Sequence, residues 1–269
     1  MTDSFPLGFV EPHREMLPQP SDETLLLKVM SLGNFEKSLN GNYLHFNRVD
    51  KYSDDRFDGD QPPLDRAINA AQGFEKPTSK TMADYVDKAR SRTYACCFSI
   101  GESRHVWEEY GGPGGQETKV GLSLTFGNLR GLLNRRMDTI LRPETKAVGD
   151  LAWLKHCSLN YGKVKYRDRN SARLTEDFLV NPIQFAFNKG TDFENEQELR
   201  VTLSMFGMGQ LVAPDGSSVE PPPSLTCPFD LRDAILDRTI QLRLDCQDAL
   251  HPLQDMMDKF SVDLTPLLT

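Results

Sequence analysis

The sequence predicts a single-domain α+β protein in which helices flank a mixed and split β-sheet. Two observations lead to this fold class. Segments with the composition of strands are interspersed with helical segments, but without the steady strand–helix–strand rhythm of a doubly wound sheet. The chain of 269 residues contains 38% hydrophobic side chains, which is enough to bury a sizeable core.

The N-terminal region divides into an arm and the start of the domain. Residues 1–20 contain four prolines and predict an extended arm that precedes a domain of residues 21–269. The first strand is expected at residues 24–30, where a run of leucines and a valine is interrupted by Lys28.

A helix, a strand and an acidic loop are expected next. Ser31 is a typical N-cap residue for a helix of residues 32–39, which the following Asn-Gly pair should end. Residues 43–46 predict the second strand, which opens into an acidic loop of residues 50–60. Two helical stretches follow the loop, at residues 64–73 and 79–90.

The middle of the chain alternates strands and helices around a glycine-rich stretch. Residues 93–100 have strand composition, and residues 103–110 have the period of a short helix that the glycines of residues 111–115 must break. Residues 120–126 alternate as a strand, and residues 129–137 predict a basic amphipathic helix.

The last elements are less regular. Strands are expected at residues 161–166, 198–204 and 234–242, with a helical or mixed segment at residues 174–187, a proline-rich surface loop at residues 212–224 and a closing helix at residues 247–260.

Composition narrows the classes of function. The formal charge of −8 does not indicate a nucleic-acid-coating surface, because phosphate binding needs clustered Lys and Arg. No apolar run approaches the roughly 20 residues of a membrane span, and the N-terminus lacks the features of a secretory signal. Five unpatterned cysteines favour reduced thiols and a cytoplasmic location.

Metal-dependent and hydrolytic chemistry find little support. The acidic loop lacks the ligand spacing and closing Glu of a calcium loop, so a solvated loop is the favoured interpretation. The five histidines are scattered and no zinc-binding spacing is present, so no metal site is expected. Neither a serine nucleophile elbow nor a phosphate-binding loop occurs. The glycines of residues 111–115 form either a flexible loop or a gate over a pocket.

The carboxylates near residue 196 are the better signal. If a strand begins near Glu196, then Glu196 and Glu198 project to the same face and raise the pKa of one member. Such a pair can bind a ribose hydroxyl with one member and stabilise a cationic transition state with the other. The alternative is an exposed strand edge on which Glu198 simply pairs with Arg200 or a nearby lysine.

Three further side chains have two readings each. Lys28 either extends to solvent or lines a polar cleft beside an acid. Trp107 and Tyr110 lie three residues apart on one helical face, where they either pack in the core or form a wall against which a flat ring stacks.

Short blocks in one order resemble a bacterial family known as domain of unknown function 2971. The family carries a Leu-Tyr-Phe strand, a Cys-Phe-Ser strand, a Trp-x-x-Tyr helix and a late Tyr-Glu-x-Glu-x-Arg run. The corresponding blocks of this chain lie at residues 43–46, 97–99, 107–110 and 193–200, preceded by blocks at residues 27–28 and 31–35 and an Asp-rich turn at residues 50–59. Met30 stands where the family has an arginine on its first strand.

This arrangement is in turn similar to ADP-ribosyltransferases, which implies an ADP-ribosyltransferase-like fold and NAD as the substrate. Carried over by position, Glu198 would be the catalytic carboxylate and Glu196 its partner. The resemblance implies cofactor-binding roles for Lys28, which would hold NAD, for Ser99, which would line the nicotinamide pocket, and for Tyr110 or Trp107, which would supply an aromatic stack.

Three hypotheses about function follow. The leading one is cleavage of NAD and transfer of ADP-ribose to a macromolecular acceptor, as in a toxin or a phage-defence effector. The first alternative is a binding module of a defence or stress system that recognises a nucleotide or a partner protein without chemistry. In the second, Glu196, Glu198 and Arg200 form a surface ion network in an interaction protein.

Overall fold

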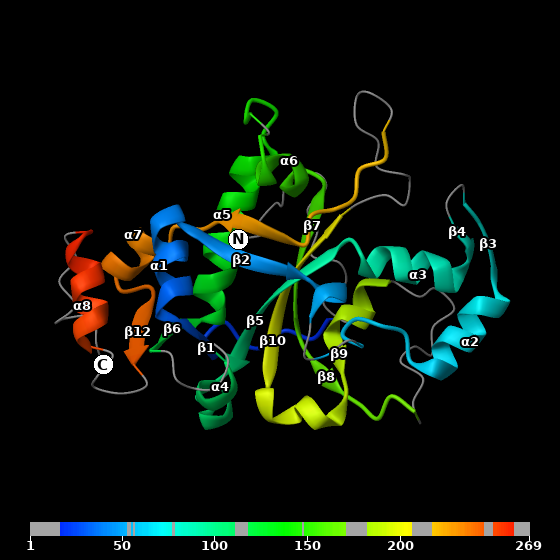
Figure 1. Ribbon diagram of the computed structural model, residues 1–269, viewed down its shortest axis with the longest axis horizontal. Helices are drawn as coiled ribbons and strands as arrows, with labels where there is room; N and C mark the ends of the chain where they lie inside the picture. Colours follow the sequence, from blue (N-terminus) through cyan, green and yellow to red (C-terminus); the bar gives the residue numbers. More distant parts are fainter. Residues whose placement is uncertain are drawn as a thin grey trace.

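The computed structural model describes residues 17–52, 55, 57–76, 79–110, 118–146, 148–170, 182–205, 217–244 and 250–260 (Figure 1). The strands of the main sheet are β1 (Leu25–Ser31), β2 (Tyr43–Arg48), β5 (Thr93–Ile100), β6 (Lys119–Thr125), β7 (Cys157–Lys163), β10 (Glu198–Met205), β11 (Ser224–Pro228) and β12 (Gln241–Leu244). Two short pairs are formed by β3 (Gly73–Lys76) with β4 (Ser79–Thr81) and by β8 (Lys165–Tyr166) with β9 (Asn188–Lys189).

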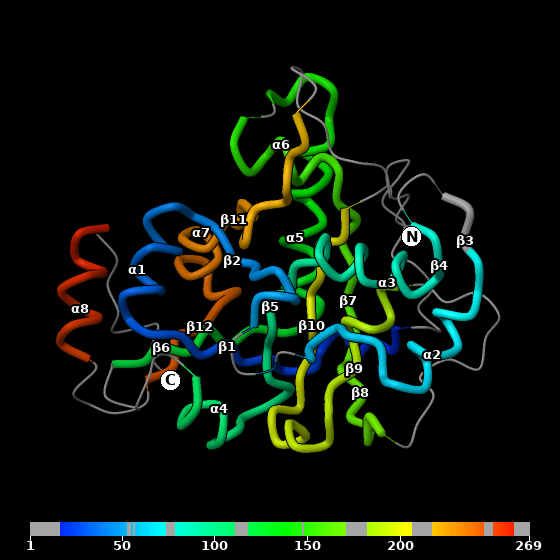
Figure 2. The backbone as a smooth tube through the Cα atoms, turned by 45° about the vertical axis from the view of Figure 1, so that its right-hand side comes forward, coloured from blue at the N-terminus to red at the C-terminus, as the bar shows by residue number. Residues whose placement is uncertain are grey.

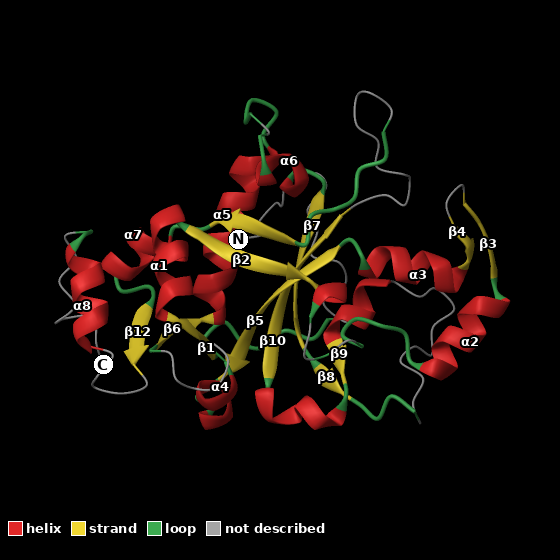
Figure 3. Cartoon of the chain, viewed as in Figure 1, coloured by secondary structure: helices red, strands yellow, loops and turns green. Residues whose placement is uncertain are grey.

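The helices lie around this sheet (Figure 3). They are α1 (Leu32–Gly41), α2 (Pro63–Ala71), α3 (Met82–Arg90), α4 (Arg104–Glu109), α5 (Phe126–Leu141), α6 (Asp150–Leu154), α7 (Leu231–Leu236) and α8 (Leu250–Asp258), with the short 3₁₀ helices η1 (Val49–Lys51), η3 (Pro182–Phe187) and η4 (Thr191–Glu196). Helices α2 and α3 and the β3–β4 pair lie at one end of the molecule, and α1, α7 and α8 lie at the other (Figures 1 and 2). The α+β class is therefore confirmed.

The main sheet is antiparallel throughout its described pairings, which corrects the expectation of a mixed sheet. Its strands follow the order β11-β2-β5-β1-β6-β12, and β10 pairs with β5 and with β7. Parallel pairing occurs in the described residues between β8 and β9, which lie outside this sheet. No two paired strands of this sheet follow each other directly in the described chain, so its antiparallel neighbours are joined by long connections that contain other elements.

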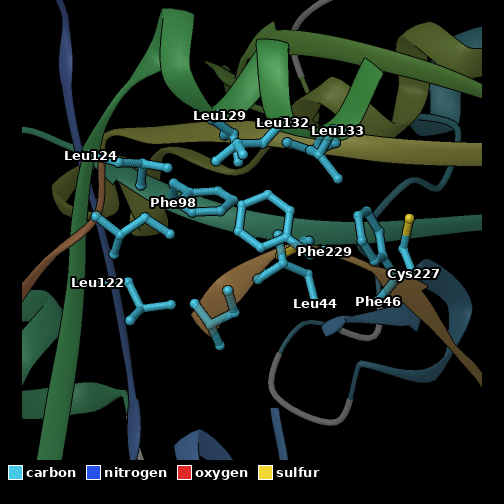
Figure 4. Packing of buried hydrophobic residues seen from close by; sticks show 14 of the residues in the cluster. Leu44, Phe46, Phe98, Leu122, Leu124, Leu129, Leu132, Leu133, Cys227 and Phe229 are labelled. Atoms are coloured by element: carbon cyan, nitrogen blue, oxygen red, sulfur yellow. The ribbon is translucent and has the colours of Figure 1, made fainter. Parts of the chain in front are cut away.

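The hydrophobic core lies on one face of the sheet. Helix α5 covers this face, and its Leu129, Leu132 and Leu133 pack in one cluster with Phe98 of β5 (Figure 4). Further members of the cluster come from β2, β6 and the segment before α7, namely Leu44, Phe46, Leu122, Leu124 and Phe229. Alternate residues of β5 and β10 belong to this core, so the residues between them point to the opposite face.

Helix boundaries near the N-terminus follow the expected capping chemistry. The Ser31 hydroxyl accepts a hydrogen bond from the Asn34 N–H at the start of α1, and Asn42 ends the helix with a left-handed φ of 52°. The predicted strand over residues 24–30 and the following helix are thus confirmed within one or two residues. Of the proline-rich arm, residues 1–16 lie outside the described residues, and Leu17 packs against Phe187 and Ala186.

One element prediction is confirmed with a later start and one is wrong, each for an identifiable reason. The helix expected at residues 79–90 begins at Met82, because Thr81 and Asp84 form a capping box and the residues before them pair as β4. The strand expected at residues 234–242 contains the end of α7 and the start of β12, which are separated by Arg238 at a φ of 63°. Here Leu231, Ala234 and Ile235 have helical spacing and are buried.

Other differences concern extent. The strand expected at residues 161–166 is β7, which begins at Cys157, followed by β8. Strands β3 and β11 and helix α6 were not expected. The glycine-rich residues 111–115 and most of the segment at residues 174–187 lie outside the described residues. None of the described helices is long and apolar enough to cross a membrane.

Candidate functional site

A pocket of about 530 Å³ lies between β1, β2, β5 and β10. This volume falls within the roughly 300–1,000 Å³ typical of small-molecule sites. The polar side chains among its lining residues include Lys28, Tyr52, Asp55, Asp58, Ser99, Tyr110, Lys189, Glu196, Glu198 and Arg200. The pocket thus gathers residues from distant parts of the chain around the middle of the sheet.

The pocket forms where β1 and β5 separate. Strand β2 pairs with the start of β5, up to Ala95, and β1 pairs with its end, from Ser99 onward. Between these two pairings the Cys97 carbonyl accepts a hydrogen bond from Lys28 Nζ at 3.2 Å. The same ammonium lies 5.5 Å from the centroid of the Phe98 ring. Lys28 therefore does not extend to bulk solvent but occupies the opening between the two strands.

Arg200 is the centre of a buried charged cluster beside this opening. Its guanidinium donates to both carboxylate oxygens of Asp58, at 2.6 and 2.9 Å, and to Glu198 at 2.9 Å. It also donates to the carbonyl of Ala186 at 2.6 Å. Strand alternation explains the contact within β10, because residues two apart share a face. Asp58 reaches the cluster from the acidic loop.

The expectation of a solvated acidic loop is wrong for two of its members. Asp58 is 2% exposed and Asp55 is 9% exposed, and both line the pocket. Asp58 is buried because it pairs with Arg200, which is itself fully buried. A carboxylate and a guanidinium in this bidentate geometry make a strong pair of charge-assisted hydrogen bonds.

Lys189 joins the two glutamates. Its ammonium donates to Glu196 Oε2 at 2.5 Å and to Glu198 Oε1 at 3.2 Å. The same group lies 4.9 Å from the centroid of the Phe193 ring. Glu196, Glu198 and Arg200 are all buried. The interpretation of these three residues as a surface ion network is therefore wrong.

The two carboxylates meet, but not through strand alternation. Glu196 ends η4, Gln197 takes a left-handed φ of 46°, and the strand begins only at Glu198. This turn and the shared contact with Lys189 bring the carboxylates together. The Tyr110 hydroxyl donates to Glu196 Oε1 at 2.6 Å, and the Ser99 hydroxyl donates to the Glu196 carbonyl at 3.1 Å.

The environment separates the pKa values of the two glutamates. Burial raises the pKa of Glu198, but the charges of Arg200 and Lys189 outweigh burial and lower it to about 2. Burial and the negative charge of Glu198 raise the pKa of Glu196, and the contacts with Lys189 and Tyr110 offset only part of this rise. Glu198 is therefore the ionised member, and Glu196 is the more basic one.

Other ionisable groups in the pocket hold their protons. Burial, with the negative charge of Glu198, raises the pKa of the Cys97 thiol to about 12. Burial and the two glutamates also raise the pKa of the Tyr110 hydroxyl. Neither side chain is a thiolate or phenolate at neutral pH, so the carboxylates are the groups available for acid–base or electrostatic chemistry.

Five of the six predicted site residues line the pocket: Lys28, Ser99, Tyr110, Glu196 and Glu198. Trp107 does not. Its ring lies over Gly121 of β6 and packs beside Leu27 and Val29, so it supports the wall formed by β1. Tyr110, the other residue expected to supply an aromatic stack, does line the pocket, as do the aromatic residues Tyr52 and Phe193, which were not predicted.

Sequence reasoning missed Lys189 and Asp58 as members of the site. Asp58 lies 142 positions from its partner Arg200, and no local pattern connects the two. Lys189 belongs to a two-residue strand after a segment without clear periodicity. Its nearness to Glu196 in the sequence was the one available signal.

Within the described residues, no group of three or more His, Cys, Asp and Glu side chains has the geometry to hold a metal ion. Comparisons of the chain with protein-family models, with curated proteins and with solved structures gave no match. The geometry of the pocket is therefore the basis for a functional proposal.

Proposed function

We propose that the pocket binds NAD and cleaves its nicotinamide–ribose bond, with transfer of the ADP-ribosyl group to a macromolecular acceptor. The observation that carries this proposal is the pair of adjacent buried carboxylates at a pocket of ligand size. One carboxylate is held ionised and the other has a raised pKa. Enzymes that cleave glycosidic bonds use two carboxyl groups whose environments set different roles in this way.

Each carboxylate has a defined task in the proposed reaction. The bond between ribose C1′ and the pyridinium nitrogen breaks, and its electron pair leaves with neutral nicotinamide. Positive charge develops on the ribose, and ionised Glu198 stabilises it. The nucleophilic atom of the acceptor then bonds to C1′ and releases a proton, which Glu196 takes as the more basic carboxylate.

The remaining predicted residues position the substrate. Lys28 Nζ is bound to a carbonyl rather than to a carboxylate, so its charge is available to the diphosphate of NAD. The Tyr110 ring lines the pocket while its hydroxyl holds Glu196. The Ser99 hydroxyl donates to the Glu196 carbonyl. We therefore assign Ser99 a role in shaping the pocket wall.

One observation favours a second candidate, a non-catalytic nucleotide-binding module. Glu198 contacts Lys189 at 3.2 Å and Arg200 at 2.9 Å and is 4% exposed. Its charge is thus balanced by two cations before any ligand arrives, which weakens the field it exerts on a substrate. Such a pocket binds a nucleotide without turning it over.

The test of the proposed function is turnover of labelled NAD by the purified chain, with a cell lysate as the source of acceptor. We expect release of nicotinamide together with transfer of label to macromolecules. Glu198→Gln keeps the shape of the side chain and removes its charge, so both signals should fall by roughly 10²-fold or more.

Glu194→Gln is the matched control, because Glu194 is an exposed glutamate of the same segment. This variant should retain full turnover. Glu198→Gln protein must give the same circular dichroism as the native chain before its loss of activity is interpreted. Equal turnover in both variants would remove Glu198 from the mechanism, and tight NAD binding without turnover in the native chain would favour the binding module.

A further inference from the structure

Two pocket-lining residues keep a buried polar atom without a hydrogen-bond partner in the part of the chain that the structure describes. These atoms are Asp55 Oδ2, an acceptor, and Arg200 Nε, a donor. Buried polar groups in folded proteins are nearly always hydrogen-bonded, and an unpaired one costs free energy. Both atoms belong to side chains at the same pocket, which points to a ligand as their missing partner.

Asp55 is held in place by its other polar atoms. Its Oδ1 accepts a hydrogen bond from the Phe57 N–H at 3.0 Å, and its carbonyl accepts one from the Asp58 N–H at 3.0 Å. Asp58 is in turn fixed by its bidentate pair with Arg200. The turn therefore fixes Asp55, a lining residue of the pocket, with one carboxylate oxygen engaged and the other buried without a hydrogen-bond partner.

The chemistry of the lining selects the ligand group. A phosphate or carboxylate would be repelled by the charge of Asp55, so Oδ2 requires a ligand group that donates a hydrogen bond. A hydroxyl fits because it donates to a carboxylate and accepts from an N–H at the same time.

We propose that Asp55 Oδ2 accepts a hydrogen bond from a ribose hydroxyl of the nucleotide bound in this pocket. The inference rests on the proposed function in one respect, namely that NAD supplies the ribose. It does not require that any bond be broken. Asp55 would thus be a specificity residue for sugar-bearing ligands, separate from the two glutamates.

The experiment is calorimetric titration of the full chain with ADP-ribose, which has no nicotinamide bond to break. Asp55→Asn keeps Oδ1 for the Phe57 N–H and replaces Oδ2 with an amide group that donates. Affinity for ADP-ribose should fall by roughly 10-fold or more, as expected for a lost hydrogen bond to a charged group. ADP-ribose analogues that each lack one ribose hydroxyl are titrated in parallel. One analogue should bind the native chain more weakly and be insensitive to Asp55→Asn.

Asp60→Asn is the matched control. Asp60 lies on the same loop, its carboxylate accepts the Gln61 N–H at 2.7 Å, and it does not line the pocket. Its variant should bind ADP-ribose as the native chain does.

The outcomes separate this inference from the proposed function. Binding of ADP-ribose that depends on Asp55, without NAD cleavage, supports the inference and removes the catalytic proposal. NAD cleavage by the native chain, together with an unchanged affinity of Asp55→Asn for ADP-ribose, supports the catalytic proposal and overturns the inference about Asp55. The inference is overturned if every deoxy analogue loses affinity equally in both proteins, or if the native chain does not bind ADP-ribose.

Discussion

Glu198 stays ionised in a buried position because Arg200 and Lys189 contact different oxygens of its carboxylate. A buried charge without partners would be costly, and here Glu198, Lys189 and Arg200 each have two partners of opposite charge. A buried ion network often stabilises a fold no more than well-packed apolar residues of similar volume would. Stability alone therefore does not explain this arrangement. Its position at a pocket is what makes a functional role the stronger explanation.

The pH dependence of stability tests the charge of Glu198. Its folded-state pKa lies below the ordinary value of 4.5, so its ionisation stabilises the fold above that pH. This contribution is lost as the pH falls from about 4.5 toward about 2. We expect Glu198→Gln to lower the free energy of unfolding by about 3–5 kcal/mol near neutral pH. The difference from the native chain should shrink through that window, as measured by urea unfolding at several pH values. A difference that does not change with pH would contradict the assignment.

The Asp58–Arg200 pair allows a comparison of buried and exposed ion pairs. Asp58→Asn leaves the buried guanidinium with one anionic partner in place of two, so it should destabilise the chain by about 3–5 kcal/mol. The control is Asp138→Asn, which breaks the exposed pair with Arg142 and should cost no more than about 1 kcal/mol. Denaturant unfolding measures both. Similar losses in the two variants would mean that Asp58 does not hold Arg200 as the distances indicate.

The residue scale also shows what the sequence could reveal of the site. Glu196, Glu198 and Lys28 stood out because charged residues beside apolar strands need an explanation. Asp58 and Lys189 did not, because their roles depend on contacts that only the folded chain creates. Sequence reasoning thus identified the candidate chemistry and Arg200 as a partner of Glu198, but not Lys189 or Asp58, which complete the charged cluster.

At the scale of elements, β5 decides where the pocket lies. Its partners on one edge change from β2 to β1, and the unshared stretch between them is the floor of the pocket. Strand β10 covers the other edge along nearly its whole length, which places Glu198 opposite Ser99 and Arg200 opposite Cys97. The site therefore depends on strand register, because a shift by one residue would turn both charges into the core.

Trp107 and Gly121 provide a test of the wall beside the pocket. A Cβ at Gly121 would lie 2.8 Å from the Trp107 ring and 2.9 Å from Leu27 Cδ1. We expect Gly121→Ala to destabilise the chain by about 1–3 kcal/mol, since two packed side chains must move.

Gly131 of α5 is the matched control for this substitution. A Cβ there meets nothing within 4 Å, so Gly131→Ala should stabilise the chain by about 0.5–1 kcal/mol through helix propensity. Thermal unfolding of both variants gives the comparison. A neutral Gly121→Ala would show that Trp107 does not pack against β6.

Elements were predictable where local pattern and tertiary packing agree. Residues 93–100 form a strand as expected, because alternation and composition favour the same structure there. The strand expected at residues 234–242 failed because its short apolar stretches, interrupted by Asp237, Arg238 and Thr239, fit a helix end and a strand equally well, and packing decides between them. Short pairs such as β8–β9 have too few residues to leave a sequence pattern.

At the scale of the whole molecule, the sheet separates two environments. Helix α5 and the apolar cluster occupy one face, and Glu198 and Arg200, which alternate with the core residues of β10, lie on the other. The core holds the sheet in place, and the two charged residues of β10 are the fixed partners that Asp58 of the acidic loop and Lys189 of β9 contact. The composition indicated a core of this size but not which face the polar residues would take.

Ligand-linked stability distinguishes the two candidate functions on the intact chain. A ligand that binds the folded state at 100 times its dissociation constant adds about 2.7 kcal/mol to the free energy of unfolding. We expect NAD and ADP-ribose each to raise the thermal midpoint of the native chain, but by different amounts. If the chain cleaves NAD, the thermal midpoint measured with NAD should move during prolonged incubation to the value measured with ADP-ribose. The Glu198→Gln variant should not show this movement. A binding module keeps the NAD midpoint constant in both proteins, and an unshifted midpoint with either ligand would contradict nucleotide binding altogether.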